Sequence, residues 1–240
     1  IRLAKAVAEA PVVINLAKLK THGLCGMTMA VKNCFGAVVG MSKARWHLRA
    51  GDDPQAFARL IAQICREVAP QLNLVDAVVA MDGNGPGSGR PRSMGFFAAS
   101  QDPFLLDRFL ALRICGLQPE QVATLAEGGQ GDLEGLRVLG DDPGAFRVDY
   151  WRMPGEASAL ASIFRPLLPW QFLRQRLSPA PKIHHKICTA CGQCVEICPA
   201  QALVIEKGKT GKRLRLDKKR CVRCYCCQEI CPEGALRVRG

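Results

Sequence analysis

Two groups of cysteines near the end of the chain have a spacing that predicts metal chemistry. The pattern Cys-x-x-Cys-x-x-Cys-x-x-x-Cys-Pro occurs twice, at residues 188–199 and 221–232. Three cysteines separated by two residues suit a loop wrapped around one [4Fe–4S] cluster, and the fourth cysteine suits ligation of the neighbouring cluster. A pair of zinc sites is the alternative, but zinc requires neither the third cysteine nor the proline. The spacing therefore favours two [4Fe–4S] clusters.

This three-plus-one arrangement assigns four cysteines to each cluster. The predicted ligands are Cys188, Cys191, Cys194 and Cys231 for cluster one, and Cys221, Cys224, Cys227 and Cys198 for cluster two. Cys226 is left over, because it aligns with Gln193 of the first repeat. We expect its thiol to be a spectator near the second cluster rather than a ligand. Residues 183–240 resemble bacterial two-cluster ferredoxins, which implies a small α+β fold and single-electron transfer at low potential.

The formal net charge of +12 is concentrated near the end of the chain. Residues 1–156 hold 17 basic and 16 acidic side chains, whereas residues 182–240 hold 13 basic and 5 acidic ones. A basic region often binds nucleic acid, but metal-bound cysteines are thiolates that cancel part of this charge, so we expect no nucleic-acid partner. We expect the basic side chains to make the potential of cluster two less negative and to dock an acidic redox partner. Those beside the second cysteine group are Lys218, Lys219, Arg220 and Arg223.

The cysteine content also bears on location. Thirteen cysteines, most of them in tight groups, indicate metal ligation rather than disulfides, and therefore a reducing compartment. We expect a cytoplasmic protein of anaerobic metabolism. No uncharged run reaches the roughly 18 apolar residues that a membrane span needs. The chain reads from Ile1 like the middle of a domain, so we expect the amino-terminal part of the fold to be missing.

The elements that must position these residues alternate between strands and helices over residues 1–155. This alternation predicts an α/β fold with some parallel strand pairing. Asp53 and Asp102 are candidate N-caps, and each is followed by proline. The cysteine domain repeats strand, cysteine triplet, short helix and strand, with a hairpin between the two copies. The predicted strands of the first domain are 10–17, 72–83, 94–100 and 135–140, and its predicted helices are 26–40, 53–69, 102–116 and 118–129.

A proline-rich linker is predicted at 156–182, between domains formed by 1–155 and 183–240. Its apolar and arginine-rich stretch, 165–176, suits packing against its own domains or docking on a membrane surface or a partner. We favour the first of these interpretations.

One stretch of the first domain, NLAKLKTHGLCGMTMAVKNCFGAVVG, concentrates lysines, a histidine and an asparagine around an expected helix start at Gly26. Clustered lysines at a helix N-terminus predict an anion site. The loop MDGNGPGSGRP offers Asp82 and Asn84 among glycines, whose backbone can approach a phosphate or a metal closely. The alternative is structural, because glycines serve turns, lysines face water and a lone histidine such as His22 is usually hydrogen-bonded within the fold.

The stretches NLAKLKTHGLCGMTMAVKN, DGNGPGSGRPR and ASQDPFLLD resemble the blocks of a family called domain of unknown function 362, over roughly residues 5–145. The resemblance implies an α/β domain with redox or cofactor chemistry, often fused to a ferredoxin module. It draws attention to Asn15, Lys18, Lys20, His22, Lys32, Asn33, Asp82, Asn84, Gly85, Asp102 and Asp107. We expect the remaining cysteines to be small buried residues, namely Cys25, Cys34, Cys65 and Cys115.

Three functions fit these features. We favour an iron–sulfur electron-transfer protein whose larger domain docks a partner or binds an anionic ligand. The second is an iron–sulfur oxidoreductase, and the third is an iron–sulfur assembly or maturation factor. The candidate catalytic residues of the second function are Lys18, Lys20, His22, Lys32, Asn33, Asp82, Asn84 and Asp107.

Overall fold

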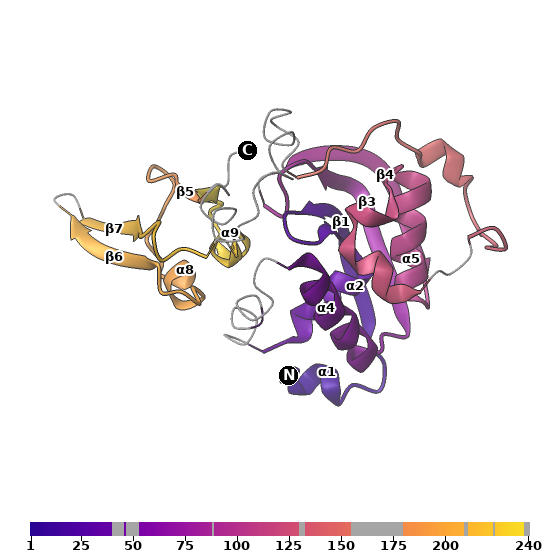
Figure 1. Ribbon diagram of the computed structural model, residues 1–240, viewed down its shortest axis with the longest axis horizontal. Coiled ribbons are helices and arrows are strands. Elements are labelled where there is room, and N and C mark those ends of the chain that lie inside the picture. The colour runs from indigo at the N-terminus through magenta and orange to yellow at the C-terminus, as the bar shows by residue number, and fades with distance from the viewer. Residues whose placement is uncertain are drawn as a thin grey trace. The chain divides into compact units, whose positions relative to one another are not determined.

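The computed structural model describes most of the chain as two compact units, which Figure 1 shows as ribbons. Unit 1 consists of Ile1–Val39 and Asp53–Pro154, and unit 2 contains the cysteine repeats. The described residues are 1–39, 46, 53–87, 89–129, 133–154, 180–208, 211–222 and 224–237. The predicted linker at 156–182 lies outside them except for its last three residues.

A four-stranded sheet in the order β2-β1-β3-β4 organises unit 1. β1 and β3 are parallel, and the two outer pairs are antiparallel. The expected α/β fold with some parallel pairing is therefore confirmed. The strands are β1 (Ile14–His22), β2 (Gly26–Thr28), β3 (Leu72–Asp82) and β4 (Arg90–Ser100).

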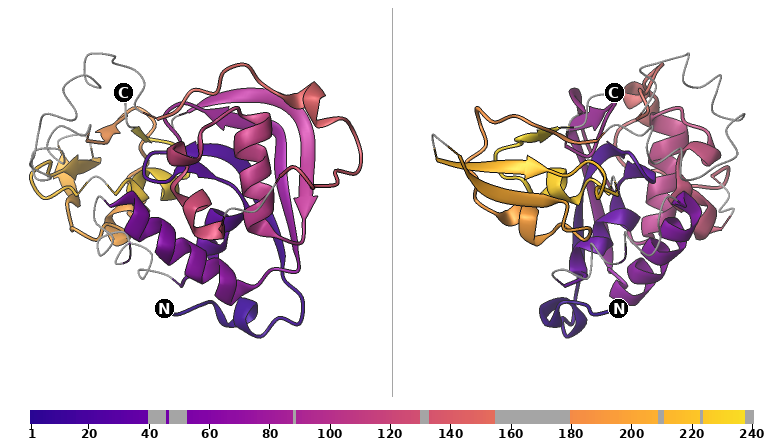
Figure 2. Two further views of the ribbon diagram at one scale, coloured as in Figure 1. Left: turned by 45° about the vertical axis from the view of Figure 1, so that its right-hand side comes forward. Right: turned by 60° about the vertical axis from the view of Figure 1, so that its left-hand side comes forward.

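One face of this sheet carries the core and the opposite face is exposed. Leu19 of β1 and Val75 of β3 are fully buried, whereas Leu16 and Phe97 on the opposite face are 67% and 62% exposed. This alternation follows from the two-residue period of a strand. The long helices lie on the buried face, as the right-hand view of Figure 2 shows. Unit 1 thus has two layers, a sheet and the helices that cover one side of it.

The helices begin where the sequence places capping residues. Asp53 accepts a hydrogen bond from the Gln55 amide at the start of α4 (Pro54–Val68), and Asp102 caps α5 (Pro103–Phe109) in the same way. Both predicted N-caps are confirmed. The other helical segments of unit 1 are α1 (Lys5–Ala8), α2 (Ala30–Asn33), η1 (Cys34–Ala37), the π-helical turn η2 (Leu110–Ile114), η3 (Pro119–Gln121), η4 (Ala123–Gly128) and η5 (Pro143–Phe146).

Two predicted elements of unit 1 are wrong. Gly26 does not begin a helix, because its φ of +79° closes a tight turn and places it in β2, paired with His22. Helical backbone begins only at Ala30. Residues 135–140 form no strand, since an apolar run becomes a strand only where a neighbouring strand supplies hydrogen bonds.

Unit 2 preserves the predicted internal duplication. Its elements are β5 (Lys182–Ile183), α8 (Gln193–Glu196), β6 (Leu203–Gly208), β7 (Gly211–Leu216), α9 (Cys226–Ile230) and β8 (Leu236–Arg237). β6 and β7 form the expected hairpin between the two copies, and β5 pairs with β8. The buried core is small, with Leu203, Leu214 and Leu236 packed around cysteines of both repeats. This is the small α+β fold that the resemblance to ferredoxins implies.

Candidate functional site

The cysteines predicted to hold cluster one lie together in unit 2. Cys194 is buried in α8, and its pKa rises to about 11, first because of burial and then because other thiols lie close by. These neighbours are Cys231, Cys188 and Cys191. The fold therefore brings one sulfur of the second repeat to three sulfurs of the first.

A second group of thiols surrounds Cys227, which is buried in α9. Burial raises the pKa of Cys227, and the nearby thiols of Cys224, Cys221, Cys194 and Cys198 raise it further. Three of these neighbours belong to the set predicted for cluster two, and Cys194 belongs to the set predicted for cluster one. The two groups are therefore adjacent, as a two-cluster domain requires.

Backbone amides are already aimed at one sulfur of each group. The amide of Ala202 donates to the Cys198 sulfur at 3.2 Å, and the amide of Ala235 donates to the Cys231 sulfur at 3.3 Å. The two bonds are equivalent in the duplication, because each joins a cysteine to the residue four positions later. Cysteines bind metal as thiolates, and thiolates that lie close together repel one another unless cations lie between them, so donor bonds and thiol groups of this kind fit iron–sulfur clusters.

Cys226, the cysteine predicted to be a spectator, lies beside two predicted ligands of cluster two, Cys224 and Cys227. It is the first residue of α9, and it is 7% exposed. Its thiol donates to the backbone carbonyl of Cys224 at 3.8 Å. A hydrogen bond from the same thiol to the Cys224 side chain lowers the pKa of Cys224 to about 7.

A basic segment immediately precedes the second cysteine group. The Asp217 carboxylate accepts hydrogen bonds from the amides of Lys219 and Arg220, and these bonds lower the pKa of Asp217. The turn holds three exposed basic side chains, including Lys218, next to Cys221. The remaining predicted basic residue, Arg223, lies outside the described residues.

In unit 1, His22 closes the turn between β1 and β2. Its side chain is 4% exposed, and its Nδ1 accepts from the amide of Leu24 at 3.1 Å and from that of Cys25 at 3.4 Å. The Cys25 sulfur is 3.5 Å from the same nitrogen. These bonds give His22 a role in shaping the turn.

Asp82 at the end of β3 is almost fully buried and carries two arginine partners. Arg92 donates to it at 3.1 Å, and Arg90 lies 3.3 Å away. In the adjoining loop, Asn84 is half-buried, and the amide of Gly85 donates to the Thr21 hydroxyl at 3.2 Å. This hydrogen bond therefore connects the loop after β3 to the carboxyl end of β1.

Asn15 and Asn33 belong to a buried amide network at the opposite end of β1. Asn33 donates to the Asn15 side chain at 2.8 Å, and Asn15 donates to the Asn73 side chain at 2.9 Å. Asn73 continues the network to the carbonyls of Ser100 and Gln101. The sequence had not singled out Asn73, and only the pairing of β1 with β3 places it beside Asn15.

The lysines of the first sequence block do not converge on one point. Lys18 lies on the exposed face of β1 and pairs with Asp76 at 2.6 Å. Lys20 is half-buried and lies opposite Thr28 and Met81 on the neighbouring strands. The remaining lysine is 7% exposed and places its ammonium over the rings of Phe35 and Phe57, at 5.6 and 6.0 Å; this is Lys32.

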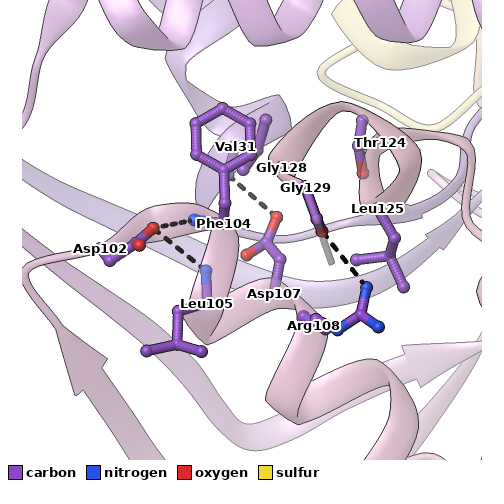
Figure 3. Close-up of a pocket in the computed structure, with 10 residues that line it drawn as sticks. All are labelled: Val31, Asp102, Phe104, Leu105, Asp107, Arg108, Thr124, Leu125, Gly128 and Gly129. Atoms are coloured by element: carbon purple, nitrogen blue, oxygen red, sulfur yellow. Dashed lines mark hydrogen bonds between the residues drawn. The ribbon is translucent and has the colours of Figure 1, made fainter. Parts of the chain in front are cut away.

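Asp107 accepts hydrogen bonds at the start of α2, the helix whose start the sequence had placed at Gly26. Both its oxygens accept backbone hydrogen bonds at the start of α2, from Ala30 at 2.7 Å and from Val31 at 3.0 Å. Burial nevertheless raises the pKa of Asp107 to about 7. Figure 3 shows it beside Asp102 and Arg108 at a small cavity. The cavity has a volume of about 50 Å³, far below the roughly 300–1,000 Å³ of pockets that bind small-molecule ligands.

The candidate residues of unit 1 thus fall into separate groups. His22, Asp82, Asn84 and Gly85 lie at the carboxyl ends of the parallel strands, where α/β proteins commonly bind ligands. Asn15 and Asn33 lie at the amino ends, and Asp107 is a buried residue of α5. The prediction that the remaining cysteines are small buried residues is confirmed for Cys25, Cys34, Cys65 and Cys115.

Comparison with known proteins supports both parts of the sequence interpretation. Residues 1–111 match the family model described as domain of unknown function (DUF362), and residues 187–235 match the 4Fe-4S dicluster domain. The thylakoid-associated protein sll1697 of Synechocystis sp. is 40% identical over 158 residues, which are 64% of this chain and 49% of that protein. The chain therefore spans about half the length of this relative. The expected fusion of the two families is confirmed, and the cysteine domain is of the 4Fe–4S class.

Proposed function

We propose that this chain, in which a DUF362 region is joined to a 4Fe-4S dicluster domain, carries single electrons through two [4Fe–4S] clusters to a partner protein. The observation that carries the proposal is the match of residues 187–235 to the 4Fe-4S dicluster domain, and the nearness of the other predicted ligands to Cys194 and Cys227 supports it. Adjacent clusters allow an electron to pass from one to the other and then to an acceptor at the surface.

The ligand assignment is the one predicted from the spacing. Cluster one is held by Cys188, Cys191, Cys194 and Cys231, and cluster two by Cys221, Cys224, Cys227 and Cys198. The thiols that raise the pKa values of Cys194 and Cys227 support this division. The dicluster match favours iron–sulfur clusters over zinc.

The exposed basic turn beside cluster two supports docking to an acidic redox protein. Lys219 and Arg220 are held next to Cys221 by the turn at Asp217, so an acidic partner bound there would lie near the cluster. Attraction between opposite charges speeds such encounters, and dissolved salt screens this attraction. Electron transfer to an acidic flavodoxin, followed by stopped flow, should slow as ionic strength rises. Reversal of both charges to Glu should remove most of that dependence, and a salt-independent rate would contradict the proposal.

For unit 1 we propose partner docking rather than binding of an anionic ligand. Lys18 and Asp82 have charged partners within unit 1, and the cavity at Asp107 is too small for a cofactor. The exposed sheet face offers large apolar side chains, Leu16 and Phe97 among them, around the Lys18–Asp76 pair. An exposed apolar face of this kind suits contact with the surface of a partner protein.

For location we propose the cytoplasm, because free cysteines and clusters need a reducing compartment. Among the described residues, every helix falls short of the length and hydrophobicity that a membrane span needs. The relative from Synechocystis sp. is named for its association with thylakoids. We therefore propose that a fraction of this protein attaches to a membrane from the cytoplasmic side, which salt extraction of washed membranes would measure.

The experiment that tests the proposed function is native mass spectrometry of the full chain, purified without oxygen, with EPR of the reduced protein. We expect about eight iron and eight sulfide per chain. Cys191→Ser, at an exposed position, and Cys221→Ser should each lose one cluster, whereas Cys115→Ala, a buried cysteine of unit 1, should keep both. Zinc masses, or no EPR signal on reduction, would overturn the proposal. An additional bound small molecule would shift the role of unit 1 from docking to ligand binding.

A further inference from the structure

The outer face of the unit 1 sheet carries a contiguous and mostly apolar patch. Strand pairing sets its side chains in rows, so that Leu16 of β1 lies opposite Leu74 of β3, and Leu74 lies opposite Ala99 of β4. Ile14 and Leu72 form the neighbouring row. We call this surface the sheet patch, and its members are Ile14, Leu16, Lys18, Leu72, Leu74, Asp76, Phe97 and Ala99.

The large apolar side chains of the sheet patch are open to solvent. Leu16 and Phe97 are the most exposed of them, and Ile14 and Leu72 are 57% and 38% exposed. A sheet with one solvated face commonly carries polar side chains on that face. A contiguous apolar surface is instead typical of a face that another protein surface covers.

The charges of the sheet patch cancel. Lys18 and Asp76 lie opposite each other in the register, and their side chains are 44% and 34% exposed. They are the only charged residues at positions 14–18, 72–76 and 97–99. An acidic or a basic partner would gain no net attraction from such a surface, in contrast to the basic turn at Asp217 in unit 2. A surface with one cation beside one anion is complementary to a second copy of itself.

We propose that the sheet patch binds a second copy of this chain, face to face, about a twofold axis that runs parallel to β1 and β3 and between them. This axis sets Lys18 of each copy opposite Asp76 of the other, because the two residues are neighbours in the register. It sets Leu16 of each copy opposite Leu74 of the other for the same reason. A twofold contact uses the same surface on both copies, which is the commonest arrangement of soluble oligomers. The inference rests on the docking role proposed for unit 1, and it names the partner.

The size and the charges of the sheet patch determine how strong the dimer is. Stable interfaces contain roughly 20–30 residues a side, more than the sheet patch supplies. We therefore expect a dimer that dissociates at micromolar concentrations. The two Lys18–Asp76 pairs would form one network of four charges in the dimer, so each charge removed from water keeps an opposite charge beside it.

The test is sedimentation velocity of the full chain, purified without oxygen, over a hundredfold range of micromolar concentrations. Leu16→Glu places a charge in the apolar contact, and Leu139→Glu is the matched control, because Leu139 is 78% exposed and lies outside the sheet. Lys18→Asp and Asp76→Lys are measured separately and as an equimolar mixture. Circular dichroism and iron content are measured for every variant, so that misfolding is separated from loss of association.

We expect a monomer–dimer equilibrium in the unmodified protein and in Leu139→Glu. Leu16→Glu should weaken the dimer about tenfold or more, because an unpaired charge would be buried in an apolar contact. Lys18→Asp and Asp76→Lys should each be monomeric, since like charges would face each other across the axis. Their mixture should form dimers again, because the two acidic side chains of one variant would then face the two lysines of the other.

A monomer at every concentration would overturn the inference and leave the proposed electron transfer intact, provided that the iron content is unchanged. A dimer that persists at full strength in folded Leu16→Glu would also overturn it, because the contact would then lie elsewhere. Dimers of Lys18→Asp and Asp76→Lys alone that are as strong as those of the mixture would overturn the twofold arrangement. Absence of clusters from a dimeric protein would instead overturn the proposed function and leave the dimer standing.

Discussion

The stability of unit 1 should decrease as the pH rises through neutrality, because of Asp107. Burial raises the pKa of this carboxyl from its ordinary value of 3.8 to about 7. Below about pH 4 the group is protonated in both the folded and the unfolded chain. Between about pH 4 and 7 the unfolded chain releases the proton while the folded protein keeps it. The stabilisation is therefore fully present below about pH 4 and is lost as the pH rises through about 7.

The magnitude follows from the two pKa values. Each unit of difference corresponds to about 1.4 kcal/mol, and the part of the difference titrated between pH 5 and 8 amounts to about 2–3 kcal/mol. Asp107→Asn removes the titration but leaves one amide of α2 without an acceptor. This variant should be less stable than the unmodified protein at pH 5, by about 1–3 kcal/mol, and the two should approach each other at pH 8.

The assay is urea unfolding of the full chain at several pH values from 5 to 8, followed by circular dichroism. The measured quantity is the difference in free energy of unfolding between the unmodified protein and Asp107→Asn, so other titrating groups cancel. A difference that stays constant from pH 5 to 8 would refute the reasoning. It would show that the two backbone hydrogen bonds offset the burial of the carboxylate.

Three further predictions concern packing and the clusters. Gly85→Ala should destabilise unit 1 by about 2–4 kcal/mol in urea unfolding, because a Cβ there would overlap the carbonyl oxygen of Thr21, whereas Gly36→Ala has open space and should be near neutral. Asn15→Ala should cost about 1–3 kcal/mol, since it removes three side-chain hydrogen bonds and takes one donor from the buried Asn73 oxygen. The iron content should stay unchanged, because all the predicted cluster ligands belong to unit 2, and loss of iron would contradict that assignment. Removal of iron with a chelator should speed hydrogen exchange in β6 and β7 but not in β1 or β3, because the core of unit 2 contains few apolar side chains, and equal protection before and after chelation would refute a structural role for the clusters.

The capping signals in unit 1 and the strand signals at 10–17, 72–83 and 94–100 were local, and the sequence identified them correctly, whereas the strand predicted at 135–140 was wrong. Asp53 and Asp102 cap helices because a carboxylate reaches amides only two or three residues away. The β3 strand followed from its apolar run in the same way. The predicted helix from Gly26 was wrong because one positive φ at a turn outweighs the apolar spacing that follows it.

The candidate site of unit 1 depended on contacts that the sequence does not contain. Asp82 suggested a free carboxylate in a glycine-rich loop, but β4 brings Arg90 and Arg92 to it across the sheet. The alternation of these two arginines in the sequence placed them on one face of a strand and could have given a hint. No local sequence pattern could connect Asp107 with the start of α2, because Asp107 and its hydrogen-bond donor Ala30 are 77 residues apart in the sequence.

The sequence by itself determined the metal chemistry of this protein, because cysteine type and spacing fix which sulfurs a short loop can present to a cluster. The tertiary structure decided everything that requires two distant segments to meet. It brought Cys231 near the first cysteine group, paired Lys18 with Asp76, and placed the Asp107 carboxyl at the start of α2. The spacing of residues in the sequence determines which side chains can meet within a few residues of one another. The partner of a side chain on another strand or helix is determined only when the whole fold is packed.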